Sequence, residues 1–141
     1  MRRAVVSLGS NLGDRRGYLR RAVSEMSERA GRVTASSSVI ETPSWGFDSF
    51  PFLNQIVVIE TWLSPMELLD TLQEIEIELG RTQKSTVDGN GEPVYYARTI
   101  DLDILDYDGV RLKNSRLTLP HPHIHDRDFE VQLLKELNVS I

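Results

Sequence analysis

Hydrophobic residues recur at helical spacing in three segments of the chain. Apolar positions fall three or four residues apart over about 14–29, 64–79 and 128–137, which predicts a helix in each segment. The second segment opens with Ser64-Pro65-Met66-Glu67, a capping box with proline at the first helical position. Gly80 follows its last apolar residue, so start and stop signals frame this helix on both sides.

Four other segments are rich in β-branched residues or alternate between apolar and polar residues. They predict strands over 4–8, 33–41, 52–62 and 100–107. With the first two helices, the order along the chain is β-α-β-β-α-β, which is typical of the ferredoxin-like motif. We therefore expect an α+β fold, a ferredoxin-like βαββαβ unit whose antiparallel sheet carries two helices on one face. Residues 1–141 are expected to form a single domain.

Composition and charge narrow the function classes. Of the 141 residues, 40% are hydrophobic and 26% charged, which excludes a disordered or fibrous protein. The net charge of −5, without a basic block, disfavours nucleic acid as a partner, and no strand carries the aromatic pattern of an RNA-recognition module. The chain has no cysteine, and its apolar start is too short for a signal peptide or a membrane span. We expect a cytoplasmic monomer with no nucleic-acid or membrane partner.

Asp101 and Asp103 are the sharpest chemical feature. Residues two apart on a strand share a face, so both carboxylates lie opposite Ile100, Leu102 and Ile104. Two like charges so placed favour a hard cation such as Mg²⁺. The alternative is an acidic face that is only solvated, as on many half-exposed sheets.

Several cationic side chains surround these acids in the sequence. They are Arg81, Arg98, Arg116, His121 and Arg127. Cations beside two carboxylates indicate a phosphate ligand, because Arg binds phosphate oxygens in fork geometry while Mg²⁺ neutralises charge. Each arginine taken singly fits a solvated surface role or a weak ion pair better than a ligand contact, so the grouping carries the argument.

Other candidate motifs are weaker. The segment Gly9-Ser10-Asn11-Leu12-Gly13 matches neither a P-loop nor a dinucleotide fingerprint, and its glycines suggest tight-turn geometry. His121-Pro122-His123-Ile124-His125 lacks cysteine support for a transition-metal site, so a single histidine that donates to phosphate is favoured. Phe52 and Phe129 fit a core role, or a pair of rings around a flat heterocycle with the Asn54 amide at its edge.

Six motifs in this order resemble one family, the 6-hydroxymethyl-7,8-dihydropterin pyrophosphokinases of folate biosynthesis. The motifs are Leu8-Gly9-Ser10-Asn11-Leu12-Gly13, Glu41-Thr42-Pro43-x-x-Gly46, Phe52-Leu53-Asn54, Glu76-x-x-x-Gly80-Arg81, Arg98-Thr99-Ile100-Asp101-Leu102-Asp103-Ile104-Leu105 and Leu119-Pro120-His121-Pro122. The resemblance implies transfer of pyrophosphate from ATP to the pterin hydroxymethyl group with release of AMP. It also implies a ferredoxin-like fold and Mg²⁺, with two ions expected.

The resemblance assigns a role to individual residues of this chain. Asp101 and Asp103 would ligate the metal and, with Arg98, form the catalytic group. The pterin would be bound by Thr42, Trp45, Phe52, Asn54 and Phe129. ATP would be bound by Gln73, Glu76, Arg98, Ile104, Arg116, Thr118, His121 and Arg127. Loops 42–51 and 84–97 would close as lids over both substrates.

Two other functions remain open at this point. A binding module that senses a small ligand would show no turnover and no metal dependence. A two-metal phosphohydrolase using Asp101 and Asp103 would release phosphate without any pterin.

Overall fold

The computed structural model describes residues 1–43, 50–80, 86–87, 93–94 and 99–141. The helices are α1 (Arg15–Arg29), α2 (Pro65–Glu78) and α3 (Asp128–Glu136). The strands are β1 (Arg2–Ser10), β2 (Arg32–Ser36), β3 (Ile40–Thr42), β4 (Phe52–Thr61), β5 (Thr86–Val87), β6 (Pro93–Val94), β7 (Asp101–Tyr107), β8 (Leu112–Lys113) and β9 (Thr118–Leu119).

The main sheet is antiparallel, with strand order β2-β4-β1-β7, and β3 also pairs with β4. β1 lies in the middle and pairs with β4 over its whole length, from Arg2 opposite Thr61 to Ser10 opposite Leu53. β7 is an edge strand on this path. The predicted α+β class is confirmed, and β1, α1, β2, β4, α2 and β7 follow each other in the expected order.

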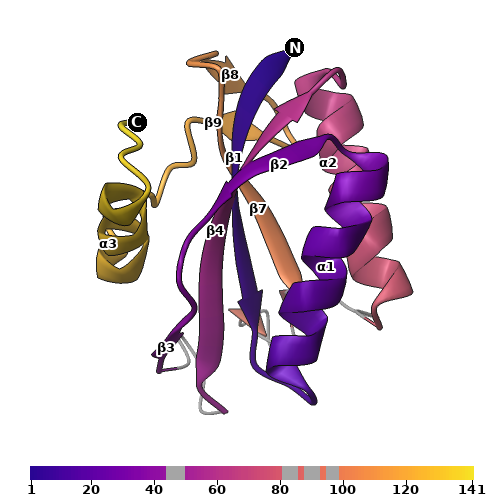
Figure 1. Ribbon diagram of the computed structural model, residues 1–141, viewed down its shortest axis with the longest axis vertical. Helices are drawn as coiled ribbons and strands as arrows, with labels where there is room; N and C mark the ends of the chain where they lie inside the picture. The colour runs from indigo at the N-terminus through magenta and orange to yellow at the C-terminus, as the bar shows by residue number, and fades with distance from the viewer. Residues whose placement is uncertain (44–49, 81–85, 88–92, 95–98) are drawn as a thin grey trace.

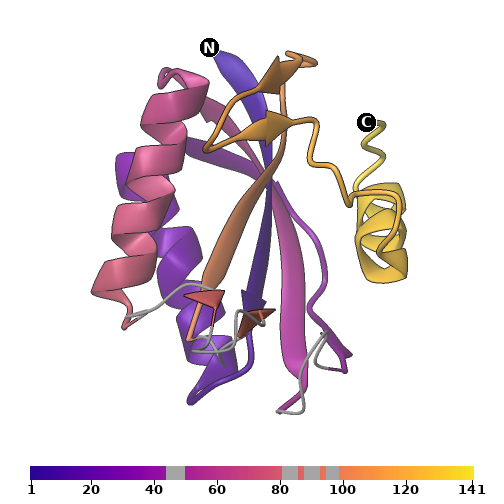
Figure 2. The same ribbon diagram turned by 180° about the vertical axis from the view of Figure 1, so that it is seen from behind.

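The sheet has an apolar core on each of its faces. On one face, Met26 of α1 and Leu72 of α2 pack in the same cluster as Leu8 of β1. On the other face, Leu133 of α3 belongs to a cluster with Ile56 of β4. Figures 1 and 2 show α1 and α2 together on one side of the sheet and α3 alone on the other. Two helices on one face were predicted, and α3 adds a layer on the opposite face.

Local signals position the helix ends as expected. The Ser64 hydroxyl accepts a hydrogen bond from Glu67 N, and the Glu67 carboxylate accepts one from Ser64 N, which completes the capping box. Gly80 has a φ of +103°, a conformation that glycine adopts without steric cost and that ends the helix. None of the helices in the described part of the chain has the length and apolar character needed to cross a membrane.

The single strand predicted over 33–41 is wrong, because it is divided into β2 and β3. The Ser37 hydroxyl accepts from Ile56 N at 2.8 Å and thereby replaces a main-chain partner. Ser38 donates from both its backbone N and its hydroxyl to the Glu136 carboxylate, each at 2.7 Å. Serine side chains that bond nearby backbone compete with the strand ladder, and they break it here. The same contacts fasten the end of α3 to the break.

The alternation predicted along 100–107 holds only for its first half. Ile100, Leu102 and Ile104 join the core under α1 and α2, as expected. Leu105 still follows the alternation and lies on the α3 side, but the pairing of β7 with β1 then shifts by one residue, so Tyr107 lies in the first core instead of beside Leu105. A β-bulge explains the shift, because one extra residue reverses the faces that follow.

The surface loop predicted over 84–93 contains short strands, which is a correction. β5 and β6 pair antiparallel, with Thr86 opposite Val94. Turn-forming residues between two brief extended pieces are typical of a hairpin. The rest of this segment lies outside the described residues.

Candidate active site

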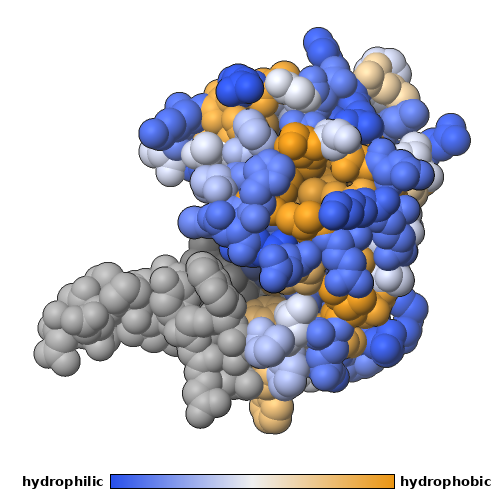
Figure 3. All heavy atoms as spheres, turned by 90° about the vertical axis from the view of Figure 1, so that its left-hand side faces the viewer, coloured by the Kyte–Doolittle hydropathy of each residue, from blue (hydrophilic) through white to orange (hydrophobic). Residues whose placement is uncertain are grey.

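One face of the sheet changes from apolar to polar along its strands. Val5, Ile56 and Leu105 lie in the core beneath α3. Further along the same strands, every second residue lines an open pocket. These residues are Ser7, Gly9, Phe52, Asn54, Asp101 and Asp103. α3 therefore covers one half of this face and leaves the other half accessible. Figure 3 looks onto the α3 side, where hydrophilic residues surround patches of apolar surface.

The pocket has a volume of about 1090 Å³ and reaches residues on both sides of edge strand β7. α2 contributes Leu69, Gln73 and Glu76. The segment between β8 and α3 contributes a further group, which includes Arg116, Thr118, His121, Arg127 and Phe129. This volume is large enough for two small-molecule substrates side by side.

Asp101 and Asp103, the two aspartates predicted to bind metal, both lie on β7 opposite residues of β1. Gly9 pairs with both Asn54 and Asp101, and Ser7 pairs with Asp103, so β1 joins the amide to the acids. Burial raises the pKa of Asp103 to about 8, and repulsion from Asp101 adds to the shift although Arg127 opposes it. Two neighbouring carboxylates repel each other when both are charged, and a bound divalent cation would relieve this repulsion. They fit Mg²⁺, which takes one or two carboxylates and completes its shell with water and phosphate.

A second candidate metal site, the three histidines after Pro120, has no support in the described residues. No group of three possible His, Asp or Glu ligands comes together in the parts of the chain that the structure describes. His121 and His123 line the pocket, and their rings are 5.9 Å apart. His123 N donates to His121 Nδ1 at 3.2 Å. A neutral His121 ring then carries its proton on Nε2, so that nitrogen is a hydrogen-bond donor.

We expect the His121 imidazole to remain neutral at physiological pH. Burial, and to a smaller extent the positive charge of Arg127, together lower the pKa of His121 to about 4. NMR titration of the ring should give a midpoint of about 4, and Arg127→Gln should raise it. A midpoint near the ordinary 6.5 in the parent protein would contradict this assignment.

Asn54 has a fixed orientation in the pocket wall. Its side-chain amide nitrogen donates to Thr42 Oγ1 at 2.8 Å, and Asn54 is 5% exposed. The Asn54 carbonyl oxygen lies 3.6 Å from the point where a Cβ on Gly9 would stand. Gly9 was expected to serve a tight turn, but it lies within β1 and keeps the pocket floor open, which corrects that expectation.

Phe52 and Phe129 are pocket residues, so the reading of both as core residues is wrong. Both are half-buried, line the pocket and lie outside the two apolar clusters. Phe52 begins β4, and Phe129 follows the first residue of α3. One aromatic ring from the sheet and one from α3 thus border the same volume.

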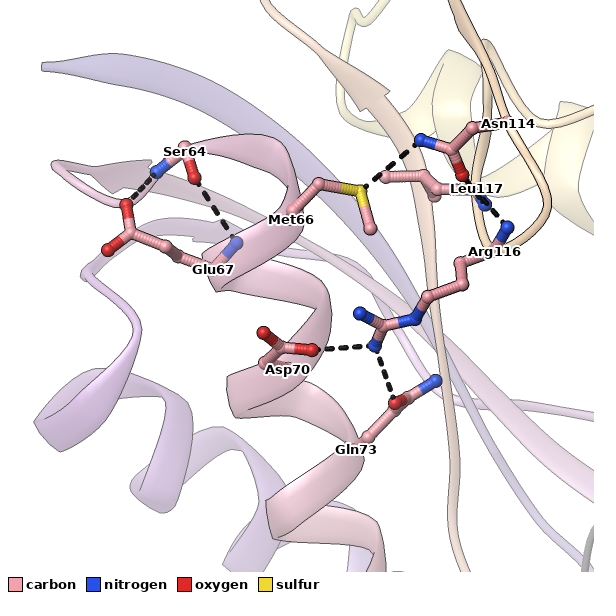
Figure 4. A network of polar contacts seen from close by, with 8 residues as sticks. All are labelled: Ser64, Met66, Glu67, Asp70, Gln73, Asn114, Arg116 and Leu117. Atoms are coloured by element: carbon pink, nitrogen blue, oxygen red, sulfur yellow. Dashed lines mark hydrogen bonds and ion pairs between the residues drawn. The ribbon is translucent and has the colours of Figure 1, made fainter.

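Arg116 is held by α2 through the network drawn in Figure 4. Its guanidinium donates from Nη2 to Asp70 Oδ1 at 2.6 Å and to Gln73 Oε1 at 3.1 Å. The Asn114 side chain accepts from the backbone N of Arg116 and of Leu117, which shapes the turn that presents Arg116. Two residues predicted to bind ATP, Gln73 and Arg116, therefore lie in direct contact.

Two buried acids support the site: Glu76 lines the pocket, and Glu130 contacts the pocket residue Arg127. Glu76 is 3% exposed, and its carboxylate accepts from Leu102 N at 2.8 Å, which satisfies a backbone donor of edge strand β7. Glu130 on α3 accepts from Arg127 Nη1 at 2.9 Å. Burial raises the pKa of Glu130, and the Arg127 charge opposes the shift.

Every described residue predicted for the site lines this pocket. The members are Thr42, Phe52, Asn54, Gln73, Glu76, Asp101, Asp103, Ile104, Arg116, Thr118, His121, Arg127 and Phe129. Trp45, Arg81 and Arg98 lie outside the described residues, as does most of both predicted lids.

Sequence reasoning missed Ser7, Asp70 and Glu130. Glu130 had a detectable signal, because it occupies the apolar stripe of the predicted third helix, three and four residues before Leu133 and Leu134. Asp70 could be found only by knowing which segment lies beside α2.

Comparison with known proteins gives consistent matches. The model of the family described as 7,8-dihydro-6-hydroxymethylpterin-pyrophosphokinase (HPPK) matches residues 5–139. The 2-amino-4-hydroxy-6-hydroxymethyldihydropteridine pyrophosphokinase of Porphyromonas gingivalis is 46% identical over 126 residues, which cover 88% of this chain and 82% of the relative. The Bacillus subtilis enzyme of the same name is 42% identical over 136 residues, covering 95% and 77% of the two chains.

The fold has counterparts among solved structures. A crystal structure of an HPPK-DHPS protein in complex with substrates superposes with a TM-score of 0.72 at 15% identity. The match covers 96% of this chain and 40% of that chain, so this chain spans less than half of the solved protein. The likeness supports the fold, and the family match together with the identity to full-length relatives shows that the chain belongs to the 7,8-dihydro-6-hydroxymethylpterin-pyrophosphokinase family.

Proposed function

We propose that residues 1–141, as a single domain, transfer the terminal pyrophosphoryl group of ATP to the hydroxymethyl oxygen of 6-hydroxymethyl-7,8-dihydropterin. The relatives from P. gingivalis and B. subtilis carry the name of this pyrophosphokinase, and a pea relative is named a folate synthesis protein. The observation that carries the proposal is one continuous pocket that is lined by an amide, two aromatic rings, acids, arginines and a histidine.

The pterin is proposed to lie between Phe52 and Phe129. Aromatic rings on two sides favour a flat heterocycle, and the oriented Asn54 oxygen supplies an acceptor for ring N–H groups at its edge. Thr42 holds that amide in place. Trp45 is proposed to line the same end.

ATP is proposed to occupy the part of the pocket beside α2 and edge strand β7. Adenosine would contact Gln73, Glu76, Ile104 and Thr118, and the phosphates would contact Arg98, Arg116, His121 and Arg127. Arginine forks and a neutral Nε2–H donor both suit phosphate oxygens. To bind phosphate, Arg116 must leave Asp70 or contact both groups at once, because the Asp70 carboxylate and the phosphate oxygens compete for the same guanidinium N–H donors.

Asp101 and Asp103 are proposed to hold Mg²⁺, two ions in the full complex. When bound, Mg²⁺ would neutralise charge on the bridging phosphate oxygens. The chain's own residues position the substrates: the aromatic pair holds the hydroxymethyl oxygen toward the β-phosphorus, and the basic side chains hold the triphosphate. A bond forms between that oxygen and the β-phosphorus, the hydroxyl proton passes to solvent water, the bond from the β-phosphorus to the AMP oxygen breaks, and AMP leaves. Most of the rate enhancement would come from positioning and electrostatics.

We further propose that the protein acts as a monomer in the cytoplasm, without nucleic acid or membrane as partner. The negative net charge of −5 supports the absence of a polyanionic partner. The lack of cysteine is compatible with a reducing compartment.

Product analysis tests the proposed reaction. The purified chain is incubated with ATP in Mg²⁺ buffer, with and without 6-hydroxymethyl-7,8-dihydropterin, and AMP, inorganic phosphate and pterin products are separated. We expect AMP and a pterin pyrophosphate in equal amounts, only when the pterin is present. Free phosphate without pterin would support a phosphohydrolase, and binding without any product would support a ligand-sensing module.

A further inference from the structure

Glu130 is a carboxylate in a place where α3 should bury an apolar side chain. It is 0% exposed and shares the inward stripe of the helix with Leu133 and Leu134. One of its oxygens, Oε1, accepts from Arg127 Nη1 at 2.9 Å. The other, Oε2, has no hydrogen-bond partner among the described residues.

Such a group is not explained by stability. A buried carboxylate loses its hydration, and one bonded oxygen recovers only part of that loss. Buried ion pairs are often replaced by apolar residues of similar volume without loss of stability. The burial that raises the pKa of Glu130 has the same physical origin. The buried carboxylate therefore lowers the stability of the fold, and its presence needs another explanation.

Among the described residues, the cation bonded to Glu130 is Arg127, three residues earlier in the chain. Arg127 lines the pocket, and its side chain is 24% exposed. It occupies the N-cap position of α3 but makes no side-chain capping bond. A long arginine side chain loses considerable rotamer freedom when it is held in one place, and a buried anion supplies that restraint in advance. A guanidinium has five N–H donors, so it can bind Glu130 and phosphate oxygens together.

We propose that Glu130 is a positioning residue for ATP: it holds the Arg127 guanidinium at the pocket wall, oriented for phosphate, before the nucleotide arrives. This inference rests on the proposed contact of Arg127 with the ATP phosphates. It assigns a functional cause to the buried charge and predicts that binding, rather than folding, suffers when the charge is removed.

The test is binding of a non-hydrolysable ATP analogue with Mg²⁺, measured by calorimetry, together with the thermal midpoint. Glu130→Met should weaken binding of the analogue by about tenfold, because the restraint on Arg127 is lost. Tm should stay the same or rise, because a buried carboxylate is removed and the Arg127 side chain, 24% exposed, is not left as a fully buried charge. Glu130→Gln keeps an acceptor oxygen and should lose less. Glu136→Met is the matched control, because it removes a carboxylate from the same helix whose partners are the Ser38 backbone and hydroxyl.

A double-mutant cycle with Arg127→Ala separates the possible outcomes. We expect Arg127→Ala to weaken the analogue and Glu130→Met to add nothing in that background. An unchanged affinity in Arg127→Ala would overturn both the phosphate contact and this inference. A loss in Arg127→Ala with none in Glu130→Met would overturn the inference alone, and equal losses in both backgrounds would show that Glu130 acts independently of Arg127. If Glu130→Met does not fold, Glu130→Gln in the same cycle decides between these outcomes.

Discussion

Asp103→Asn is expected to reduce pterin-dependent AMP formation by about a thousand-fold or more. The variant keeps the shape of the side chain but removes a negative ligand, and a bound metal ion contributes several kcal/mol of charge stabilisation in phosphoryl transfer. The thermal midpoint without metal should not fall, because a neutral amide avoids the burial cost and the repulsion from Asp101 that raise the pKa of Asp103. Initial rates at saturating Mg²⁺, with Mn²⁺ binding measured separately, check both expectations.

Asp108→Asn serves as the control for that variant. Asp108 follows the same strand, but it is exposed, pairs with Arg2 and has a φ of 51°, which asparagine also tolerates. It should keep near-parental activity, since an exposed ion pair contributes little. Full activity in Asp103→Asn with unchanged Mn²⁺ binding would show that the acidic face of β7 is only solvated.

Asn54→Leu should raise the KM for the pterin by about ten- to a hundred-fold while leaving affinity for the ATP analogue unchanged. The leucine fits the same volume but removes both the acceptor offered to the ligand and the bond to Thr42. A ligand N–H that enters this pocket would then be desolvated without a partner, which costs roughly 1–3 kcal/mol. Steady-state kinetics with each substrate varied in turn distinguishes the two affinities.

Gln55→Met provides the matched control for the amide. Gln55 is the next residue of β4, and its amide donates to Ser37 O at the strand break instead of lining the pocket. Its KM for the pterin should stay within about twofold of the parent, since surface changes away from the site have small effects. Equal effects of the two variants would place the cause in the stability of β4 rather than in recognition.

The sequence predicted the elements that have strong local signals. The capping box at Ser64 and the glycine at 80 fixed α2, and the alternation from Ile100 to Ile104 placed two carboxylates on one face. The break at Ser37 and the shift at Leu105 were not predicted, because each depends on a neighbouring strand or on α3. Periodicity reports one element at a time, whereas bulges arise from pairing.

The sequence predicted which residues form the site but not how they lie relative to one another. Motif spacing could name Gln73 and Arg116 as nucleotide residues, yet it could not show that they touch or that Asp70 shares the guanidinium. It also could not settle whether Phe52 and Phe129 belong to a core, because an aromatic ring has the same pattern in a core and in a pocket wall. Segments 43 or more positions apart must meet before these questions have an answer.

The two hydrogen bonds between Ser38 and Glu136 join positions 98 apart in the chain. Contacts of such long sequence separation form late, because the chain between them must first lose its freedom. The rings and charges that α3 and its approach bring to the pocket therefore arrive only after the sheet and the first two helices have assembled. During synthesis, the nascent chain would have a nearly complete sheet before it could retain either substrate, so the onset of ligand binding would mark the end of folding rather than its beginning.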